Sequence, residues 1–307
     1  MQIGIIHRSI NNIYSVLSEG VMYTCRIKGK VLKVEQKEYN PLCVGDEVVI
    51  EKYSESEALI LSRNERRSSF TRWNMKTEQN QTIVANMDQV GIVLSVESPP
   101  FRPRFIDRAI CCVTGCHIIL IMNKSDFLLS EEEFDRWALY HKLGYKIIAV
   151  SAQTGDGLDE LKALLRGKVT ALVGQSGVGK SSLINALLPT VSKQNVNSVS
   201  QKFNKGRHTT NHSLFLHGDE YDLIDTPGVR EIQVPTRSNT EILSHFPELR
   251  DLECPVKGCL HEGEDECLVP ELIEKGEIDI DRYESYLRIQ EAVRARVPEY
   301  FRGKNKK

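Results

Sequence analysis

The chain has 307 residues, of which 40% are hydrophobic and 27% are charged, and its formal net charge at pH 7 is −2. This length allows two or three domains, and the composition is that of an ordinary globular protein. A net charge near zero gives no argument for nucleic-acid binding by the whole molecule, so any basic surface must be local. We find no signal-peptide pattern at the N-terminus and no apolar run long enough for a membrane span. The eight cysteines are scattered, which excludes a disulfide framework and favours a reducing cytoplasm.

Residues 1–64 predict a small β-domain. Tyr23–Val34 and Val44–Ile50 alternate apolar and polar residues, and Ala58–Leu61 closes the segment. Short strands in a segment of this size suit the five-stranded oligonucleotide-binding barrel (OB-fold), which would make residues 1–64 an RNA-binding domain. A generic small β-domain is the other interpretation, and the pattern alone favours neither.

Residues 63–82 read as a basic, polar connector to the next domain. Its arginines are interleaved with aromatic side chains, the set being Arg63, Arg66, Arg67, Phe70, Arg72 and Trp73. Arginine together with aromatic residues can bind phosphate and stack on bases. A solvated linker is the simpler interpretation of the same composition.

Residues 65–236 predict an α/β domain. The expected strands are Gln89–Val96, His117–Met122, Tyr145–Val150 and Lys168–Val173, followed by a hairpin of Leu214–Leu216 and Tyr221–Ile224. The expected helices are Pro103–Cys116, a segment that runs from a Ser130–Glu133 capping box to about Leu143, and Leu158–Leu165. This alternation indicates a mainly parallel sheet covered on both faces, which binds ligands at the carboxyl ends of its strands.

A phosphate-binding loop follows the strand Lys168–Val173. Residues 174–181 match G-x-x-x-x-G-K-[ST], and a helix-like pattern begins at Ser182. The glycines let main-chain N–H groups converge on phosphate oxygens, and the helix directs its positive end at the same charge. Lys180 is expected to reach the β- and γ-phosphates, and the Ser181 hydroxyl to hold Mg²⁺. The predicted phosphate-binding residues are Gly174, Gln175, Ser176, Gly177, Val178, Gly179, Lys180, Ser181 and Ser182.

Two short motifs upstream of this loop point to guanine. In Asn123-Lys124-Ser125-Asp126, the Asp126 carboxylate can accept hydrogen bonds from both the ring N–H and the exocyclic amine of guanine. The Lys124 stem can lie over the base. Ser151-Ala152 follows the next strand and adds a main-chain N–H near the base oxygen. Together with Asp225-Thr-Pro-Gly228, these residues complete the set of a GTPase that binds GTP and Mg²⁺.

The order of these motifs is unusual. In familiar GTPases the phosphate loop precedes the base-reading motifs, whereas here residues 123–126 and 151–152 come first. The sequence therefore indicates a circularly permuted GTPase, which is tolerable because the termini of a domain commonly lie close together. Because of the permutation, the chain continues from Gly228 directly into the C-terminal module. We hypothesise that this covalent link transmits the state of the γ-phosphate to that module.

Residues 237–307 predict a helical, metal-binding C-terminal domain. Three thiolates and an imidazole form the ligand set of a closed, structural Zn²⁺ site, and they come from Cys254, Cys259, His261 and Cys267. A helix over Asp281–Val297, ended by Pro298, is predicted from apolar residues at Tyr286, Ile289, Val293 and Val297. The basic tail 302–307 is a further candidate for phosphate contacts.

The ordered set of motifs resembles the bacterial small-ribosomal-subunit biogenesis GTPase family, called RsgA or YjeQ. The resemblance covers nearly the whole chain and also includes Val44-Gly-Asp46, Ala85–Gln89, Ile106–Arg108, Gly206–Thr210 and Phe246–Leu249. It implies an OB-fold barrel, a circularly permuted GTPase core and a zinc domain. It also implies GTP hydrolysis stimulated by the small (30S) ribosomal subunit during its late maturation, with 16S rRNA contacted by the barrel and the zinc domain. We expect a cytoplasmic monomer.

The sequence offers more than one residue that could position the attacking water. Val229 stands where many GTPases carry a water-orienting glutamine, so intrinsic hydrolysis is expected to be slow. The resemblance offers His208 as the substitute, and Thr210 rather than Thr209 as the switch ligand to Mg²⁺. His212 is a rival, and a structural role for His208 is the other interpretation. The expected catalytic residues are His208, Lys180 and Thr210.

Three other functions fit parts of the sequence. A non-ribosomal regulatory GTPase would use the barrel and the metal domain to bind proteins, and salt-sensitive RNA binding would argue against it. A nucleotide-dependent kinase would need a second-substrate site, which the sequence does not show. A passive RNA-binding protein with a degenerate nucleotide site is at odds with the intact Lys180, Ser181 and Asp225.

Overall fold

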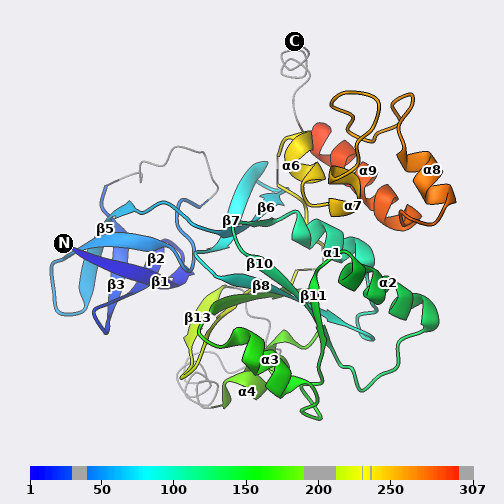
Figure 1. Cartoon of the computed structure of the whole chain (residues 1–307). Helices are drawn as coiled ribbons and strands as arrows, with labels where there is room; N and C mark the ends of the chain where they lie inside the picture. Colours follow the sequence, from blue (N-terminus) through cyan, green and yellow to red (C-terminus); the bar gives the residue numbers. More distant parts are fainter. Residues whose placement is uncertain (30–39, 190–211, 230, 236, 297–307) are drawn as a thin grey trace. The chain divides into compact units, whose positions relative to one another are not determined.

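The computed structural model describes residues 1–29, 40–189, 212–229, 231–235 and 237–296 (Figure 1). The chain divides into two compact units, of which the first comprises Met1–Phe101 and Val113–Glu231. The second comprises Arg102–Cys112 and the chain from Ile232 onward. Among the described residues, no helix is long and apolar enough to cross a bilayer.

The first unit begins with a closed five-stranded barrel. Its strands are β1 (Gln2–Ile10), β2 (Ile13–Ser18), β3 (Val21–Ile27), β4 (Glu47–Lys52) and β5 (Glu57–Arg63). β1 pairs with both β2 and β4, and β5 joins β4 to β3, which closes the barrel. Alternate strand residues, such as Ile6, Val16 and Ile60, are fully buried in its core. The predicted barrel is confirmed, although β3 ends at Ile27 and residues 30–34 of the predicted strand lie outside the described part.

The segment 63–82 was expected to be a solvated connector, and this expectation is wrong. β6 (Ser69–Asn74) and β7 (Gln79–Ala85) form an antiparallel hairpin, and β6 also pairs with β9 (Val113–Thr114). Phe70 and Val84 face each other across the hairpin and are buried. The other pairs are mostly polar, for example Arg72 with Gln81. The hairpin therefore lacks the apolar alternation that identifies a strand in a sequence.

The rest of the first unit is the predicted α/β domain. Its strands are β8 (Gln89–Ser95), β10 (His117–Asn123), β11 (Lys146–Ala149), β12 (Val169–Gly174), β13 (Leu214–His217) and β14 (Asp222–Asp225). They lie in the order β11-β10-β8-β12-β14-β13, and every neighbouring pair is parallel except β13 with β14. β13 also pairs with β1, so the sheet continues into the barrel. The mainly parallel sheet and the β13–β14 hairpin are confirmed.

Helices cover both faces of this sheet. They are α2 (Glu131–Lys142), α3 (Leu158–Leu165) and α4 (Lys180–Leu187). Leu161 of α3 and Leu183 of α4 pack into one buried cluster with strand residues such as Ile121. Met122, the next residue of the same strand, lines a cavity on the other face together with Trp137 of α2. α2 begins with the predicted capping box of Ser130 and Glu133.

The second unit is helical. Its helices are α1 (Pro103–Ile110), α6 (Asn239–Leu243), α7 (Pro247–Arg250), α8 (Val269–Glu274) and α9 (Ile280–Arg294). The predicted apolar face of α9 is buried at Tyr286, Ile289 and Val293. The helix ends at Arg294, earlier than predicted, and Val297 and Pro298 lie outside the described residues.

α1 belongs to the second unit although its sequence lies between two strands of the first. The helix predicted over Pro103–Cys116 ends at Ile110, because Val113 and Thr114 pair with β6. Gly115 then turns the chain with φ +74°, and a Cβ there would lie 2.3 Å from the carbonyl oxygen of Arg67. The side chain of Asp107 joins α1 to α9 through an ion pair with Arg282, and both side chains are buried.

Candidate nucleotide-binding site and metal centre

The four predicted nucleotide motifs meet at one edge of the sheet in the first unit. Residues 123–126 follow β10, residues 151–152 follow β11, residues 174–181 follow β12, and residues 225–228 begin at the end of β14. These four strands are parallel members of one sheet, so their carboxyl ends lie on the same side. This edge is where open α/β sheets bind their ligands.

The phosphate loop has the backbone that its sequence requires. Gly177 and Gly179 have φ values of +91° and +86°, a region that favours glycine. Ser176, Gly177, Ser181 and Ser182 are exposed at the edge, where a ligand can reach them. Gly179 caps the N-terminus of α4, so the positive end of that helix faces the loop.

Lys180 is held inside the phosphate loop. Its side chain is only 7% exposed, and its ammonium group donates to the carbonyl oxygens of Gly174 and Gln175. Burial lowers the pKa of Lys180, and the nearby Asp225 carboxylate acts in the opposite direction. A buried ammonium group at the centre of the loop is suited to the phosphates of a nucleotide.

Asn123 connects the phosphate loop to the base-reading loops. Its side-chain amide donates to the carbonyl oxygen of Val178 over 2.9 Å and accepts from the main-chain N–H of Ala152 over 3.1 Å. A Cβ at Gly179 would lie 2.4 Å from the Asn123 amide nitrogen, so only glycine permits this approach. The three motifs therefore have fixed positions relative to one another.

The other base-reading residues surround this connection. Lys124 has φ +62°, and its ammonium group donates to the carbonyl oxygens of Glu97 and Ser98. The main chain of Ser125 donates to Val150, and the Asp126 side chain is exposed. Ser151 is fully buried, and its hydroxyl accepts hydrogen bonds from the main-chain N–H groups of residues 153 and 154.

The Asp225-Thr-Pro-Gly228 turn lies against the phosphate loop. Thr226 ties the turn to β12 through a 2.7 Å hydrogen bond to the carbonyl oxygen of Leu172. The main chain of Val229 pairs with Gln175 in a parallel bridge. Asp225 is buried, with 8% of its surface exposed.

The expected catalytic loop can be placed only in part. His208, Thr209 and Thr210 lie outside the described residues. The rival His212 is described; it is exposed and precedes β13. The roles of these residues therefore stay predictions.

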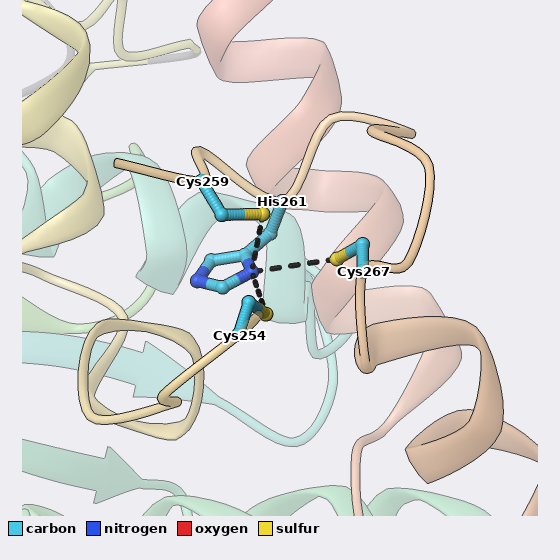
Figure 2. A group of neighbouring side chains, drawn as sticks. All are labelled: Cys254, Cys259, His261 and Cys267. Carbon is cyan, nitrogen blue, oxygen red and sulfur yellow. Dashed lines mark hydrogen bonds between the residues drawn. The ribbon is translucent and has the colours of Figure 1, made fainter. Parts of the chain in front are cut away.

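The structure brings together the four predicted metal ligands of the second unit (Figure 2). The sulfur atoms of Cys254, Cys259 and Cys267 each lie 3.5 Å from Nδ1 of His261, and all four ligand atoms lie within 4.8 Å of one another. Tetrahedral zinc with Zn–S of about 2.3 Å and Zn–N of about 2.0–2.1 Å places sulfur and nitrogen about 3.5–3.6 Å apart. The four side chains can hold a metal ion, and their spacing fits zinc.

Further residues hold these ligands in place. His261 has φ +57° and hydrogen-bonds to the main chain of Leu249, which leaves Nδ1 directed at the sulfurs. Tyr283 and Tyr286 of α9 donate to the carbonyl oxygens of His261 and Leu260. Burial raises the pKa of Cys259, and a cation bound among the four ligands would act in the opposite direction and favour the thiolate.

Several contributors to both sites were not predicted from the sequence. The carbonyl groups of Glu97 and Ser98 act through the main chain, so no residue type marks them. Tyr286 was predicted as a core residue of α9, and its hydroxyl role at the metal loop was missed. The spacing of Tyr283 and Tyr286, which puts both on one side of α9, was the available signal.

Comparison with known proteins identifies the family. A sequence model described as RsgA GTPase matches residues 63–235, more than half of the chain. The chain belongs to the RsgA GTPase family. It is therefore a GTP hydrolase, and its barrel matches the model described as RsgA N-terminal domain over residues 3–60.

Members of the RsgA family resemble the chain along almost its whole length. The small ribosomal subunit biogenesis GTPase RsgA of Borreliella burgdorferi (strain ZS7) is 39% identical over 286 residues, which are 91% of this chain and 92% of the relative. The protein of the same name from Geobacillus kaustophilus (strain HTA426) is 37% identical over 304 residues, covering 97% and 99% of the two chains.

Two solved structures share the fold. The crystal structure of YjeQ from Thermotoga maritima has a TM-score of 0.69 at 27% identity, and the match covers 96% of this chain and 99% of that one. YloQ, described as a circularly permuted GTPase, has a TM-score of 0.67 at 26% identity, with 98% and 97% covered. The predicted combination of barrel, permuted GTPase domain and helical metal-binding module is confirmed.

Proposed function

We propose that this RsgA-family chain hydrolyses GTP during late maturation of the small ribosomal subunit, and that its turnover is stimulated by that subunit. The single observation that supports this most strongly is the Asn123 side chain, which joins the phosphate loop at Val178 to the base-reading loop at Ala152. Through these two hydrogen bonds, motifs whose order in the sequence is permuted come together at one nucleotide site. The names of the relatives supply the ribosomal subunit as the partner.

At the phosphate end, Lys180 contacts the β- and γ-phosphates, and main-chain N–H groups of residues 176–182 surround them. The hydroxyls of Ser181 and Thr210 would hold Mg²⁺, which neutralises phosphate charge when bound. Val229 has an apolar side chain that cannot orient the attacking water. We therefore assign this role to His208. Support for the roles of Lys180 and Ser181 comes from the burial of Lys180 and the exposure of Ser181 at the sheet edge.

At the base end, Asp126 accepts from the guanine ring N–H and amine, and the Lys124 stem covers the base. The anchoring of the Lys124 ammonium group by two carbonyl oxygens keeps that stem extended across the site. Ala152 offers a main-chain N–H to the base oxygen. An adenine ring would leave the Asp126 carboxylate without its donors.

We further propose that Cys254, Cys259, His261 and Cys267 bind one structural Zn²⁺, and that the chain has three domains, at residues 1–64, 65–236 and 237–307. The barrel and the zinc domain would contact 16S rRNA, in a cytoplasmic monomer. The closed set of four ligands supports a structural metal, because it leaves no position for a substrate.

The test is GTP and ATP turnover by the purified chain, with and without small ribosomal subunits. We expect slow, GTP-specific hydrolysis that rises by at least about tenfold with subunits, since one correctly positioned acid–base side chain typically contributes roughly 10²–10⁴ in rate. His208→Ala should retain GDP binding and lose the stimulation. If subunits leave turnover unchanged, the ribosomal role is wrong and a guanine-specific switch with another partner takes its place.

A further inference from the structure

A short loop at the nucleotide edge, residues 95–99, begins at the end of β8, and we call it the β8 loop. Ser95 is the last residue of β8 and pairs with Asn123 of β10 in the parallel ladder. Ser95 is buried, with 2% of its surface exposed, and its hydroxyl donates to the carbonyl oxygen of Pro99 over 2.7 Å. This hydrogen bond joins the two ends of the β8 loop.

The β8 loop holds the ammonium group of Lys124. The carbonyl oxygens of Glu97 and Ser98, in the middle of the loop, accept from this group over 2.9 Å and 2.7 Å. Both acceptors are main-chain groups, so their positions depend on the shape of the loop and not on the side chains at residues 97 and 98. The hydrogen bond from Ser95 to Pro99 fixes that shape.

The position of the Lys124 ammonium group matters for the neighbouring carboxylate. Lys124 and Asp126 lie two residues apart in one loop, and the Asp126 side chain is exposed. A lysine side chain is long and flexible, so an ammonium group released from the β8 loop can pair with this carboxylate and compete with guanine for it. An anchored Lys124 also loses less conformational entropy when a nucleotide binds.

We propose that Ser95 is a positioning residue for guanine recognition. Its hydroxyl holds the β8 loop in the shape that anchors Lys124, so the Lys124 stem covers the base and the Asp126 carboxylate stays available to it. This inference rests on the proposed guanine nucleotide site, and it gives a role there to a serine that belongs to none of the four nucleotide motifs. Loss of the hydroxyl therefore weakens nucleotide binding through Lys124.

The first test compares Ser95→Ala with Ser68→Ala in the full chain. Ser68 is the matched control: it is also 2% exposed, and its hydroxyl also donates to a main-chain carbonyl oxygen, that of Met87, over 2.6 Å. Met87 precedes β8, so this bond lies at the opposite end of the strand from the nucleotide edge. Each substitution removes one buried hydroxyl and should lower the unfolding midpoint of the nucleotide-free protein by a similar amount.

GDP binding should distinguish the two variants. We expect the dissociation constant for GDP to rise by about two- to tenfold in Ser95→Ala, the value of one hydrogen bond, and to keep its wild-type value in Ser68→Ala. The increase in the unfolding midpoint that GDP produces should be smaller in Ser95→Ala for the same reason.

A double-mutant cycle measures whether Ser95 acts through Lys124. Lys124→Met keeps the apolar stem and removes the ammonium group, so the β8 loop has no group left to anchor. In this background Ser95→Ala should change the dissociation constant for GDP by less than about twofold. A loss as large as in the wild-type background would mean that Ser95 only supports the fold, and the inference would be wrong.

Binding of GDP by the wild-type chain separates this inference from the proposed function. A wild-type chain that binds no GDP would overturn both. A wild-type chain that binds GDP, together with a Ser95→Ala variant that binds it equally well, would overturn the inference alone.

Discussion

Asp126 is the exposed carboxylate at the end of a loop whose first residue, Asn123, is fixed by two hydrogen bonds. The surrounding loop is rigid, so the choice of base depends on the donors and acceptors that residue 126 presents. A carboxylate presents only acceptors, which suits the N–H and the amine of guanine.

Asp126→Asn should change the preferred base from guanine to xanthine. Xanthine has a carbonyl oxygen where guanine has its amine, and the asparagine amide would donate to this oxygen while its own oxygen accepts from the ring N–H. The ratio of affinities for GDP and xanthosine diphosphate should change by a factor on the order of 10⁴, because a mismatched base leaves buried polar groups unpaired. Competitive binding of the two nucleotides to both proteins measures it.

An Asp126→Asn variant that still prefers GDP would show that residue 126 does not read the base. Ser125→Ala is a suitable control, since the contact of Ser125 to Val150 uses the main chain.

His7 is a buried histidine where the barrel meets the sheet. It is 5% exposed, and its ring stacks on Phe215 of β13 with a centroid distance of 4.7 Å. Burial lowers the pKa of His7 to about 4, His217 adds to this effect, and Asp222 opposes it. The folded chain therefore keeps His7 neutral at a pH where the unfolded chain protonates it.

This difference predicts a loss of stability in mild acid. Between pH 6.5 and about pH 4, the unfolded state binds more protons at His7 than the folded state, so the free energy of unfolding falls as the pH falls. The loss attributable to His7 reaches at most about 3 kcal/mol. His7→Phe, which can stack on Phe215, should lose less stability over this range. Urea unfolding of both proteins from pH 7 to pH 4 tests this, and parallel pH profiles would contradict it.

In the sequence α1 lies between strands of the first unit, but in the structure it packs in the second unit. Its Asp107 forms a buried ion pair with Arg282 of α9. Arg282 also pairs with Glu248 of α7, so one guanidinium group joins three helices. Burial raises the pKa of Glu248, and Arg282 acts in the opposite direction.

Asp107→Asn should destabilise the second unit by about 3 kcal/mol, because removing one partner leaves the buried charge of Arg282 poorly compensated. Hydrogen exchange within α9 measures the effect. Glu284→Gln is the matched control: Glu284 pairs with Arg104 of α1, but both side chains are more than 40% exposed, so its loss should cost less than about 1 kcal/mol. Equal protection of α9 in the wild type and in Asp107→Asn would mean that α1 does not stabilise this unit.

Across the whole molecule, features that depend on local patterns of residue type could be predicted from the sequence. Features formed by main-chain groups that are distant in the sequence could not. Strand alternation predicted the barrel, and strands followed by motifs of glycine, lysine and aspartate at fixed spacings predicted the nucleotide edge. The cysteine and histidine spacing predicted the metal ligands, which the structure brings together. In each case the residue type itself carries the chemistry.

Three features were not predicted: the hairpin of β6 and β7, the packing of α1 in the second unit, and the main-chain bridge of Val229 with Gln175. Apart from a few buried residues such as Phe70 and Val84, the hairpin is mostly polar, so its strand periodicity is hidden. The amphipathic pattern of α1 predicts a helix but does not indicate the unit in which this helix packs. The bridge of Val229 with Gln175 uses main-chain groups that any residue other than proline would supply.

The second unit consists of two separate stretches of the chain, so it can fold only after both stretches have been synthesised. Arg282 is made 175 residues after Asp107, and at roughly 5–20 residues per second this takes roughly 9–35 s. Throughout that interval α1 lacks the helix that it joins, while the strands on either side of it in the sequence can already assemble. The barrel and the nucleotide edge can therefore form early in the nascent chain, but the metal-binding unit closes only after Arg282 has been made.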